Sequence, residues 1–226
     1  NIKLCRQYIN ANILWHNITK VSGMNNDIIV IDNVIPKDYS DHIKNLMTGW
    51  EFGWVFNQTM VSPDAELQGE SNHAGFNHFF YENQQAASQH FNFLYPLVLS
   101  VTSASKTPYN RLIRMRANLT LPNKTSTLDH HMPHIDSFFE HWNAIYYVND
   151  SDGDTVIFNE TNDDYDAGKD DIMRIQSNKF TVKQRIEPKQ GRVVVFPGKY
   201  YHSSSFAKDS NYRCVINMNL DRVQLT

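Results

Sequence analysis

The sequence predicts a mainly β fold, a sandwich or jelly roll that follows an N-terminal α/β region. Three observations lead to this prediction. Residues 111–121 (RLIRMRANLTL) alternate apolar and polar side chains with a period of two, which is typical of a half-buried strand. Several short β-branched and aromatic runs with turns between them follow this segment. The chain has 226 residues, 41% of them hydrophobic, and is long enough to bury a core in one domain.

The first part of the chain is predicted to supply a strand, a helix and a long loop. The β-branched run DIIVIDN (27–33) predicts a strand, and apolar residues at helical spacing predict a helix from Asp38 to about Gly49. The aromatic residues 50–56 are expected to form a short strand. Residues 57–77 are polar and contain Gly and Pro, so we expect a long loop, a feature that often acts as a lid near a pocket.

One further helix is predicted at residues 83–105, with a bend at Pro96 because proline removes a helical hydrogen bond. The strands expected after Pro108 are short and separated by turns. They are residues 111–121, 133–136, 142–149, 154–160, 178–188, 191–198, 201–206 and 212–220. The acidic, glycine-containing stretch 161–171 is interpreted as a solvated loop.

The domain organisation is predicted to be simple. Residues 27–226 are expected to form one domain, with its jelly-roll core at about residues 110–222, and no internal repeat is seen. The chain begins with Asn1 rather than Met, and Met24 lies just before the first expected strand. We therefore treat residues 1–26 as an uncertain N-terminal extension.

The charge balance argues against a nucleic-acid or membrane partner. Lys and Arg number 21 and Asp and Glu 24, a formal net charge of −3 at pH 7. The apolar run at 91–101 is too short to cross a bilayer, and the N-terminus lacks the pattern of a signal peptide. The distant Cys5 and Cys214 fit neither a disulfide framework nor a zinc ribbon. We expect a cytoplasmic protein, and the sequence indicates no oligomeric state.

The segment DHHMPHIDSFFEHW (129–142) is rich in histidine and acidic residues, and part of it predicts a metal site. In a strand, His134 and Asp136 at positions i and i+2 point to the same face. A jelly roll brings distant strands together at its mouth, and His202 in FPGKYYHSSSF is the expected third ligand. Two imidazoles and one carboxylate on one face of a metal form the arrangement suited to non-haem Fe(II).

A basic residue eleven positions after His202 strengthens this prediction. In NYRCVINMNL, strand alternation sends Arg213, Val215 and Asn217 to one face. A guanidinium binds a carboxylate through two parallel hydrogen bonds, whereas an inward-facing arginine without such a partner is a costly buried charge. We therefore expect an anionic ligand beside the metal.

Several features together resemble the Fe(II)/2-oxoglutarate-dependent oxygenase superfamily, most closely its prolyl 4-hydroxylase-like branch. They are His134 and Asp136, residues 145–158 (IYYVNDSDGDTVIF), residues 188–206 (PKQGRVVVFPGKYYHSSSF) and Arg213. The resemblance covers residues 110–222, and residues 27–47 also look like the strand and helix that open such domains. It implies a core of the double-stranded β-helix (jelly-roll) type with flanking helices.

The resemblance implies an Fe(II)-dependent dioxygenase that uses O₂ and decarboxylates 2-oxoglutarate to succinate and CO₂ while it hydroxylates an unactivated C–H bond. Ascorbate is expected as a supporting reductant. The leading substrate is a prolyl residue in a peptide or protein, and a free amino acid or another small molecule is the alternative. A nucleic-acid substrate is disfavoured, because Asn219 stands where the nucleic-acid demethylase branch carries a second arginine.

By the same resemblance, His134, Asp136 and His202 bind Fe(II), and no catalytic residue beyond the metal ligands is needed. The 2-oxoglutarate would chelate the metal through its 1-carboxylate and 2-keto oxygens. Arg213 would pair with its distal carboxylate, and Tyr147 matches a tyrosine that hydrogen-bonds the same carboxylate in similar hydroxylases. Tyr147 could otherwise be a core aromatic.

Four further residues are expected near the pocket. Asn118 and Asn217 lie where the family often places polar co-substrate contacts, although both also fit as ordinary strand residues. Trp142 and His141 are expected near the mouth of the site, where they could contact substrate, with a core position favoured for Trp142.

Two departures from the family pattern concern recognition rather than the metal. The prolyl hydroxylases often carry glycine before the co-substrate-binding basic residue, where this chain has Asn211 and Tyr212. The connection at residues 120–132 is longer than usual. We therefore expect the substrate to be the least transferable part of the resemblance.

Other kinds of site remain as alternatives. Asp150, Asp152 and Asp154 alternate as in a calcium loop, but Thr155 replaces the required glycine and no helix flanks the segment, so a turn is predicted. A catalytically idle jelly-roll binding module and a zinc-dependent cupin-like enzyme are also open, although neither explains Arg213.

Additional histidines could join His134 in a zinc site. They are His130, His131 and His141. His131 and His134 are not on a common strand face, however, so surface or substrate-facing positions are expected for these three residues.

Overall fold

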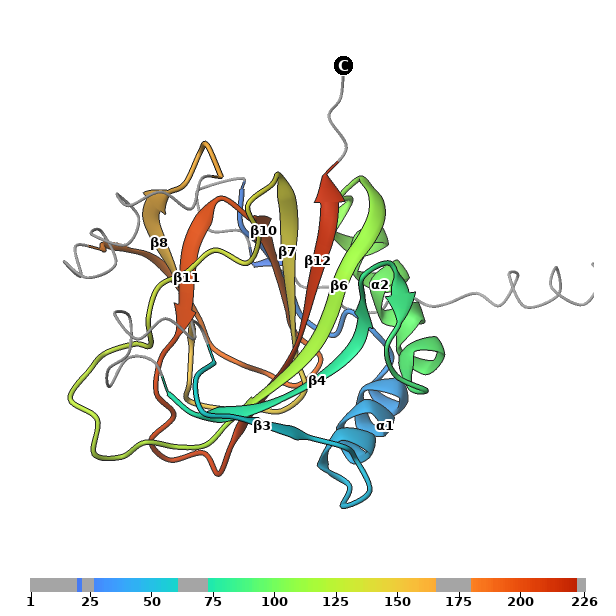
Figure 1. Cartoon of the computed structure of the whole chain (residues 1–226), viewed down its shortest axis with the longest axis horizontal. Helices are drawn as coiled ribbons and strands as arrows, with labels where there is room; N and C mark the ends of the chain where they lie inside the picture. Colours follow the sequence, from blue (N-terminus) through green and yellow to red (C-terminus); the bar gives the residue numbers. More distant parts are fainter. Residues whose placement is uncertain (1–19, 22–26, 61–72, 166–179, 223–226) are drawn as a thin grey trace, which may run out of the picture.

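The computed structural model describes residues 20–21, 27–60, 73–165 and 180–222, which form two antiparallel sheets and two helices (Figure 1). The larger sheet has the strand order β1-β2-β10-β7-β12-β6-β4-β3, with β5 paired to β4. Its strands are β1 (Lys20–Val21), β2 (Ile29–Ile31), β3 (Val55–Asn57), β4 (Gly75–Glu82), β5 (Gln85–Ala86), β6 (Tyr109–Thr120), β7 (His141–Tyr147), β10 (Val193–Pro197) and β12 (Arg213–Arg222). The smaller sheet has the order β11-β8-β9. Its strands are β8 (Thr155–Thr161), β9 (Val182–Ile186) and β11 (Tyr200–Ser204).

The chain passes back and forth between the two sheets. It runs from β6 and β7 of the large sheet to β8 and β9 of the small one. It then returns to the large sheet at β10, crosses again to the small sheet at β11 and ends in the large sheet at β12. All strand pairs are antiparallel in the described part of the chain. The predicted mainly β, jelly-roll core is therefore confirmed, and its strands lie near the predicted runs except at residues 133–136, which form no regular strand.

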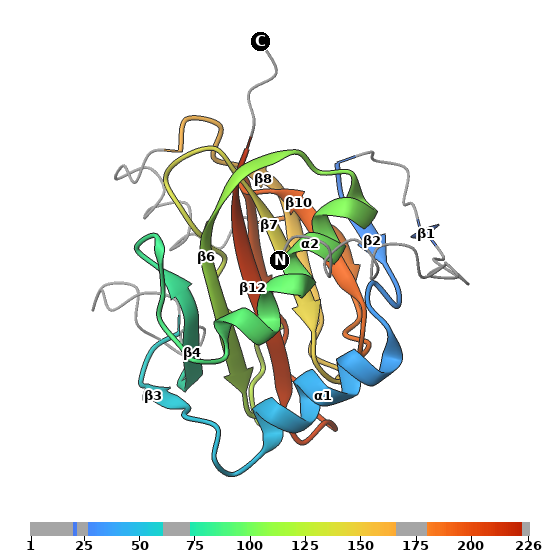
Figure 2. The same cartoon turned by 90° about the vertical axis from the view of Figure 1, so that its right-hand side faces the viewer.

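Both helices cover the outer face of the large sheet, on the side away from the small sheet (Figures 1 and 2). Helix α1 (Lys37–Thr48) buries Ile43 and Met47, one turn apart, and ends before Gly49 as predicted. Helix α2 (Phe91–Ser105) buries Leu94, Leu97, Val98 and Val101. Each fully buried side chain of this size contributes roughly 1.5–3 kcal/mol to folding.

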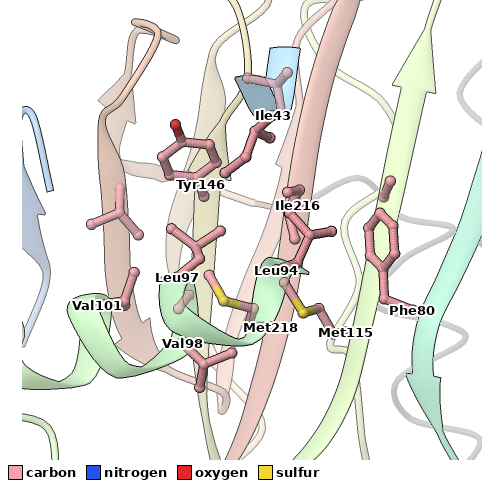
Figure 3. Close-up of a cluster of buried hydrophobic side chains, with 14 of the residues drawn as sticks. Ile43, Phe80, Leu94, Leu97, Val98, Val101, Met115, Tyr146, Ile216 and Met218 are labelled. Atoms are coloured by element: carbon pink, nitrogen blue, oxygen red, sulfur yellow. The ribbon is translucent and has the colours of Figure 1, made fainter. Parts of the chain in front are cut away.

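The sheet side of this core comes from alternate residues of the central strands. Figure 3 shows Met115 on β6, Tyr146 on β7, and Ile216 and Met218 on β12 packed against the helices. Because strand side chains alternate, the residues between them point the other way, toward the small sheet. That inner face of β6 and β12 is largely polar, and it forms one wall of the candidate site.

The N-terminal expectations are confirmed for the strand at Ile29–Ile31 and for α1, but the strand predicted at residues 50–56 is shorter. The Phe52 N–H donates to the Gly49 carbonyl and the Trp54 N–H to the Phe52 carbonyl, so a turn occupies the first part and pairing begins at Val55.

The loop predicted at residues 57–77 and the helix predicted at 83–105 both include β structure. Strand β4 begins at Gly75, and Asn83 and Gln84 have φ of 51° and 62°, which makes a two-residue turn into β5. Helix α2 therefore begins only at Phe91, and it continues through Pro96. Residues 61–72 of the predicted loop lie outside the described residues.

Two other expectations concern segments at the edge of the described residues. The predicted acidic loop 161–171 begins at the last residue of β8, and its residues 166–171 lie outside the described residues. Of the strand predicted at 178–188, residues 178 and 179 also lie outside them.

Neither of the two described helices is long and apolar enough to cross a membrane.

Candidate metal centre and anion pocket

The backbone of the small sheet places two imidazoles side by side. His134 and His202 lie opposite each other in an antiparallel bridge, and each donates its N–H to the carbonyl oxygen of the other at 3.0 Å. Residues paired in this way project their side chains to the same face. The two ring centroids are 4.6 Å apart. The pairing register therefore brings together two residues that are far apart in the sequence.

The segment that carries His134 is not the regular strand predicted at residues 133–136. It makes one isolated bridge, and the His131 N–H donates to the Ser204 carbonyl oxygen, which leaves one extra residue on this side of the pairing. This shift in register interrupts the ladder with β11 on the N-terminal side of His134. One bridge is enough to fix His134 against His202.

Both imidazoles have a defined tautomer. Nδ1 of His134 lies 3.2 Å from the Met132 carbonyl oxygen, and Nδ1 of His202 lies 3.3 Å from the Tyr200 carbonyl oxygen. A carbonyl only accepts hydrogen bonds, so Nδ1 carries the proton in each ring and Nε2 has the free lone pair. Burial lowers the pKa of His202 to about 4 and also lowers the pKa of His134, which keeps both rings neutral near pH 7.

Asp136 completes a group of three possible metal ligands. Nε2 of His134 lies 3.9 Å from Oδ1 of Asp136, and Nε2 of His202 lies 3.7 Å from Oδ2. The three ligand atoms lie within 4.8 Å of one another, and no other such group occurs among the described residues. The structure thus brings together the three side chains that the sequence predicts as iron ligands.

The Asp136 carboxylate is held by side chains of the large sheet. Arg114 on β6 donates from Nη2 to Oδ1 at 3.1 Å, and Asn217 and Asn219 on β12 donate their amide N–H groups to Oδ2 at 2.8 and 3.0 Å. The side chain is 3% exposed. Burial alone would raise the pKa of Asp136, but Arg114 and the neighbouring imidazoles hold it well below its usual range. The carboxylate is therefore ionised.

A second cluster is formed by Arg213, Tyr147 and Thr155, of which Arg213 and Thr155 line the same pocket as the two histidines, whereas Tyr147 is fully buried behind Thr155. The buried Arg213 donates from Nε to the Gly153 carbonyl oxygen at 2.7 Å and from Nη2 to the Thr155 hydroxyl at 2.8 Å. The Tyr147 hydroxyl donates to the same Thr155 oxygen at 2.7 Å. Arg213 makes no ion pair with any described residue, so its charge is left for a ligand.

Gly153 allows the close approach that positions Arg213. A Cβ atom on Gly153 would lie 3.0 Å from Cδ of Arg213 and 3.2 Å from the Ser205 carbonyl oxygen. Only glycine leaves the arginine side chain undisturbed at this contact.

The expected pocket residues Asn118 and Asn217 both line this cavity, together with His134, His202 and Arg213. As predicted, Arg213, Val215 and Asn217 share one face of β12. The amide nitrogen of Asn217 is already bound to Asp136, so this residue contacts the carboxylate of the metal group directly. Tyr146 and Tyr147 face opposite sides, as predicted, with the Tyr146 hydroxyl bonded to Ser40 on α1.

The two residues expected at the mouth of the site do not line the pocket. His141 is fully buried, so the expectation of a surface position is wrong. Its ring packs directly on Gly198, where an added Cβ on the glycine would lie 2.2 Å from Cε1 of His141. Its Nδ1 is hydrogen-bonded to the Phe139 carbonyl oxygen. Trp142 is half-buried against the helical core, with the Arg222 guanidinium 4.7 Å from its ring centroid. The favoured core position of Trp142 is confirmed.

The other candidate ligands do not join the metal group. His131 is not at the surface: it is buried against Phe206, with 3.8 Å between ring centroids, and it lines the same pocket as His134, while burial lowers its pKa to about 2. His130 packs edge-on against Phe158. Asp152 accepts three backbone N–H groups from residues 208–210, so it holds that segment rather than joining a metal group.

Sequence reasoning missed several residues that build this site. They are Arg114, Thr155 and Asn219 around the predicted ligands, and Arg116, which lines the pocket. The period-two pattern of residues 111–121 could have indicated Arg114 and Arg116, because both share the inward face with Asn118. The same alternation places Asn219 after Asn217 on the inner face of its strand, whereas no local signal marks Thr155.

Comparison with known proteins agrees with the geometry of the site. Residues 121–219 match the profile of the family described as "Putative 2OG-Fe(II) oxygenase". This segment contains Asp136, both histidines and Arg213. No curated protein matches the chain.

Solved structures share the fold at low sequence identity. A Pseudomonas putida prolyl-4-hydroxylase is 14% identical with a TM-score of 0.52, over 88% of this chain and 94% of that one. A Trichoplax adhaerens prolyl hydroxylase, in complex with a peptide fragment of the hypoxia inducible factor oxygen degradation domain, is 14% identical with a TM-score of 0.56, over 87% and 84%.

A third solved structure is an enzyme of small-molecule biosynthesis. The epimerase SnoN, in complex with Fe3+, alpha ketoglutarate and nogalamycin RO, is 13% identical with a TM-score of 0.56, over 87% of this chain and 80% of that one. The sequence motifs, the match of residues 121–219 to this family and the shared jelly-roll fold agree with the resemblance of the chain to the Fe(II)/2-oxoglutarate-dependent oxygenase superfamily and its prolyl hydroxylase-like members.

Proposed function

We propose that this chain is an Fe(II)- and 2-oxoglutarate-dependent dioxygenase that hydroxylates an unactivated C–H bond. The observation that carries the proposal is the presence, in one pocket, of a metal-competent group and a buried arginine that lacks an anionic partner among the described residues. The first provides for a metal and the second for an acidic co-substrate. A binding module without catalysis has no need of both.

His134, Asp136 and His202 would hold the iron. Their chemistry fits Fe(II): two neutral imidazoles with Nε2 lone pairs available, and one ionised carboxylate. The Nδ1 to carbonyl contacts orient both rings, and Arg114, Asn217 and Asn219 orient the carboxylate. When bound, the iron supplies O₂ activation coupled to decarboxylation of 2-oxoglutarate to succinate and CO₂.

Arg213 and Tyr147 would bind the distal carboxylate of 2-oxoglutarate. Both already donate to the Thr155 hydroxyl, so three polar groups meet at one point. The Thr155 hydroxyl can in turn donate its own proton to a carboxylate. Asn118, on the same pocket wall, would supply a further polar contact to the co-substrate.

The test is formation of succinate from 2-oxoglutarate by the purified protein with Fe(II), O₂ and ascorbate. We expect turnover that requires Fe(II) and is abolished by a chelator. Arg213→Ala should chiefly weaken 2-oxoglutarate binding, because it removes the charge that pairs with the distal carboxylate, while metal binding is retained. A protein that neither binds 2-oxoglutarate nor forms succinate with any substrate pool would refute the proposal.

We further propose a prolyl residue of a peptide as the leading substrate. Its support is the shared fold with two prolyl hydroxylases and the sequence resemblance to that branch. A small molecule is the second candidate, supported by the equal structural likeness to SnoN, which was solved with nogalamycin RO. Proline-containing peptides and small molecules should be compared by succinate formation and by a mass gain of one oxygen in the substrate.

A further inference from the structure

The pocket contains a second arginine that no role described so far uses. Arg116 lies on the inner face of β6, directly opposite Asn217 of β12, and lines the same cavity as His134 and Arg213. The Phe79 ring of the neighbouring strand β4 lies 5.6 Å from its guanidinium and helps to fix its position. Arg116 is therefore placed in the pocket by two adjacent strands.

The guanidinium of Arg116 is unsatisfied among the described residues. Its Nε is buried without a hydrogen-bond acceptor, and it makes no ion pair within 4.0 Å in this part of the chain. Arg114, two residues earlier on the same face, is in contrast fully engaged, with Nε bonded to Asn219 and Nη2 bonded to Asp136. Burial, and then repulsion from Arg114, lower the pKa of Arg116, and the attraction of Asp136 and Glu82 offsets them only in part. An anion beside it would relieve both effects.

The proposed co-substrate does not supply that anion. Arg213 lies opposite Thr120 on the β6–β12 ladder, whereas Arg116 lies opposite Asn217. Four residues separate these two positions, or roughly 13 Å along a strand. One carboxylate of 2-oxoglutarate is assigned to the metal and the other to Arg213, so we assign the anion beside Arg116 to another molecule.

Asn217 adds a matching acceptor beside Arg116. Its amide nitrogen must face Asp136, because a carboxylate only accepts hydrogen bonds, and this fixes the direction of its Oδ1. That oxygen is buried without a donor in the described part of the chain. A ligand with a carboxylate for Arg116 and a nearby N–H for Asn217 would satisfy both groups at once.

We propose that Arg116 binds a carboxylate of the primary substrate, next to an N–H group that Asn217 accepts. The inference rests on the proposed function, and it narrows the substrate to a free amino or imino acid, or to a peptide oxidised at or near its free C-terminus. The planar guanidinium of Arg116 suits a carboxylate, because two of its N–H groups can donate to the two carboxylate oxygens in parallel.

A panel of acids paired with their primary amides tests this proposal. Proline, other free amino acids and dipeptides that end in proline would each be compared with the corresponding amide by the rate of succinate formation. We expect the best acid to exceed its amide by about tenfold or more in kcat/KM, since a charge-assisted bidentate pair is lost in the amide.

Variants of Arg116 then locate the effect. In Arg116→Met the preference for the acid should fall to about threefold or less, with Arg116→Lys in between, because lysine keeps the charge but not the planar fork. The matched control is Arg111→Met, since Arg111 lies on the same strand but is exposed and pairs with Asp221. It should retain the preference. Thermal unfolding of each variant checks that it is folded.

The outcomes separate this inference from the proposed function. If the wild-type protein binds metal and 2-oxoglutarate but no acid exceeds its amide, the substrate assignment is wrong and the oxygenase assignment stands. If Arg116→Met weakens 2-oxoglutarate binding by about tenfold in the absence of substrate, Arg116 belongs to the co-substrate site, which also overturns the inference. If 2-oxoglutarate neither binds nor turns over, both proposals fail.

Discussion

The two parts of the candidate metal site are held in different ways. His134 and His202 are placed by backbone hydrogen bonds of the small sheet, and their rings are oriented by carbonyl groups of their own segments. Asp136 reaches across to the large sheet, where three side chains donate to its carboxylate. One part of the site is therefore held by backbone pairing and the other by side-chain chemistry.

This difference determines how each part responds to mutation. A backbone pair needs only the correct register, so it tolerates changes in the side chains around it. A buried carboxylate held by side-chain donors depends on each donor, because every lost hydrogen bond changes its position and leaves another polar group unsatisfied. Apart from the ligands themselves, substitutions on the inner face of β6 and β12 should therefore affect the metal more than those on the small sheet.

The largest effect is expected from removal of Asp136. Asp136→Ala removes a proposed ligand, so metal affinity should fall by more than the roughly 10- to 100-fold loss typical when only an outer partner of a ligand is removed. It also leaves the Arg114 charge without its partner, which should cost about 3–5 kcal/mol of stability. Titration with Mn(II), which is stable in air, and thermal unfolding measure the two effects.

Asp136→Asn separates these effects. The amide oxygen still accepts hydrogen bonds, so part of the stability should return while the metal affinity does not. Metal binding by Asp136→Ala close to that of the wild-type protein would show that Asp136 is not a ligand.

A smaller effect is expected from Asn219→Ala. This side chain donates to Asp136 and to Asn143 and accepts from Arg114, so its loss should loosen the carboxylate and lower metal affinity by about 10- to 100-fold. The matched control is Asn159→Ala on the small sheet, where the amide donates only to the Thr181 hydroxyl. Equal metal affinity in both variants would contradict the contrast between the two parts.

The proposed ligands were accessible from the sequence because their signals are local. His134 and Asp136 have the spacing of one strand face, and His202 and Arg213 follow in a family-like pattern of short strands. These features survive the error in the predicted strand at residues 133–136, because a single bridge to His202 fixes the same geometry. The ligand prediction was therefore insensitive to the exact secondary structure.

The groups that support the ligands depend on pairing between distant strands, which the sequence does not specify. Asn219 meets Arg114 because β6 and β12 pair in one register, and bulges shift that register just beyond Asn219. Thr155 on β8 of the small sheet reaches Arg213 on β12 of the large one, a contact between the two sheets. His141 looked available for a ligand role, but its close packing on Gly198 is a tertiary contact without a local signal.

Gly153→Ala tests the close contact between the backbone at Gly153 and the side chain of Arg213. The added Cβ would press on Cδ of Arg213 at 3.0 Å, so 2-oxoglutarate affinity should fall by about tenfold, while metal affinity stays close to that of the wild-type protein. Gly53→Ala is the matched control, because no atom lies within 4 Å of its added Cβ. Isothermal titration with each ligand distinguishes the variants, and unchanged 2-oxoglutarate binding in Gly153→Ala would argue against Arg213 as the anchor.

The smallest effect on the metal is expected from Pro133→Ala, which tests the part of the site held by the backbone. Alanine frees the φ angle of the unfolded chain and should cost about 0.4–1 kcal/mol of stability. The N–H and carbonyl of His134 can still pair with His202, so metal affinity should change by less than about threefold. Urea unfolding and Mn(II) titration measure these quantities. A tenfold loss of metal affinity would mean that the rigidity of Pro133, rather than the single bridge, holds His134 in place.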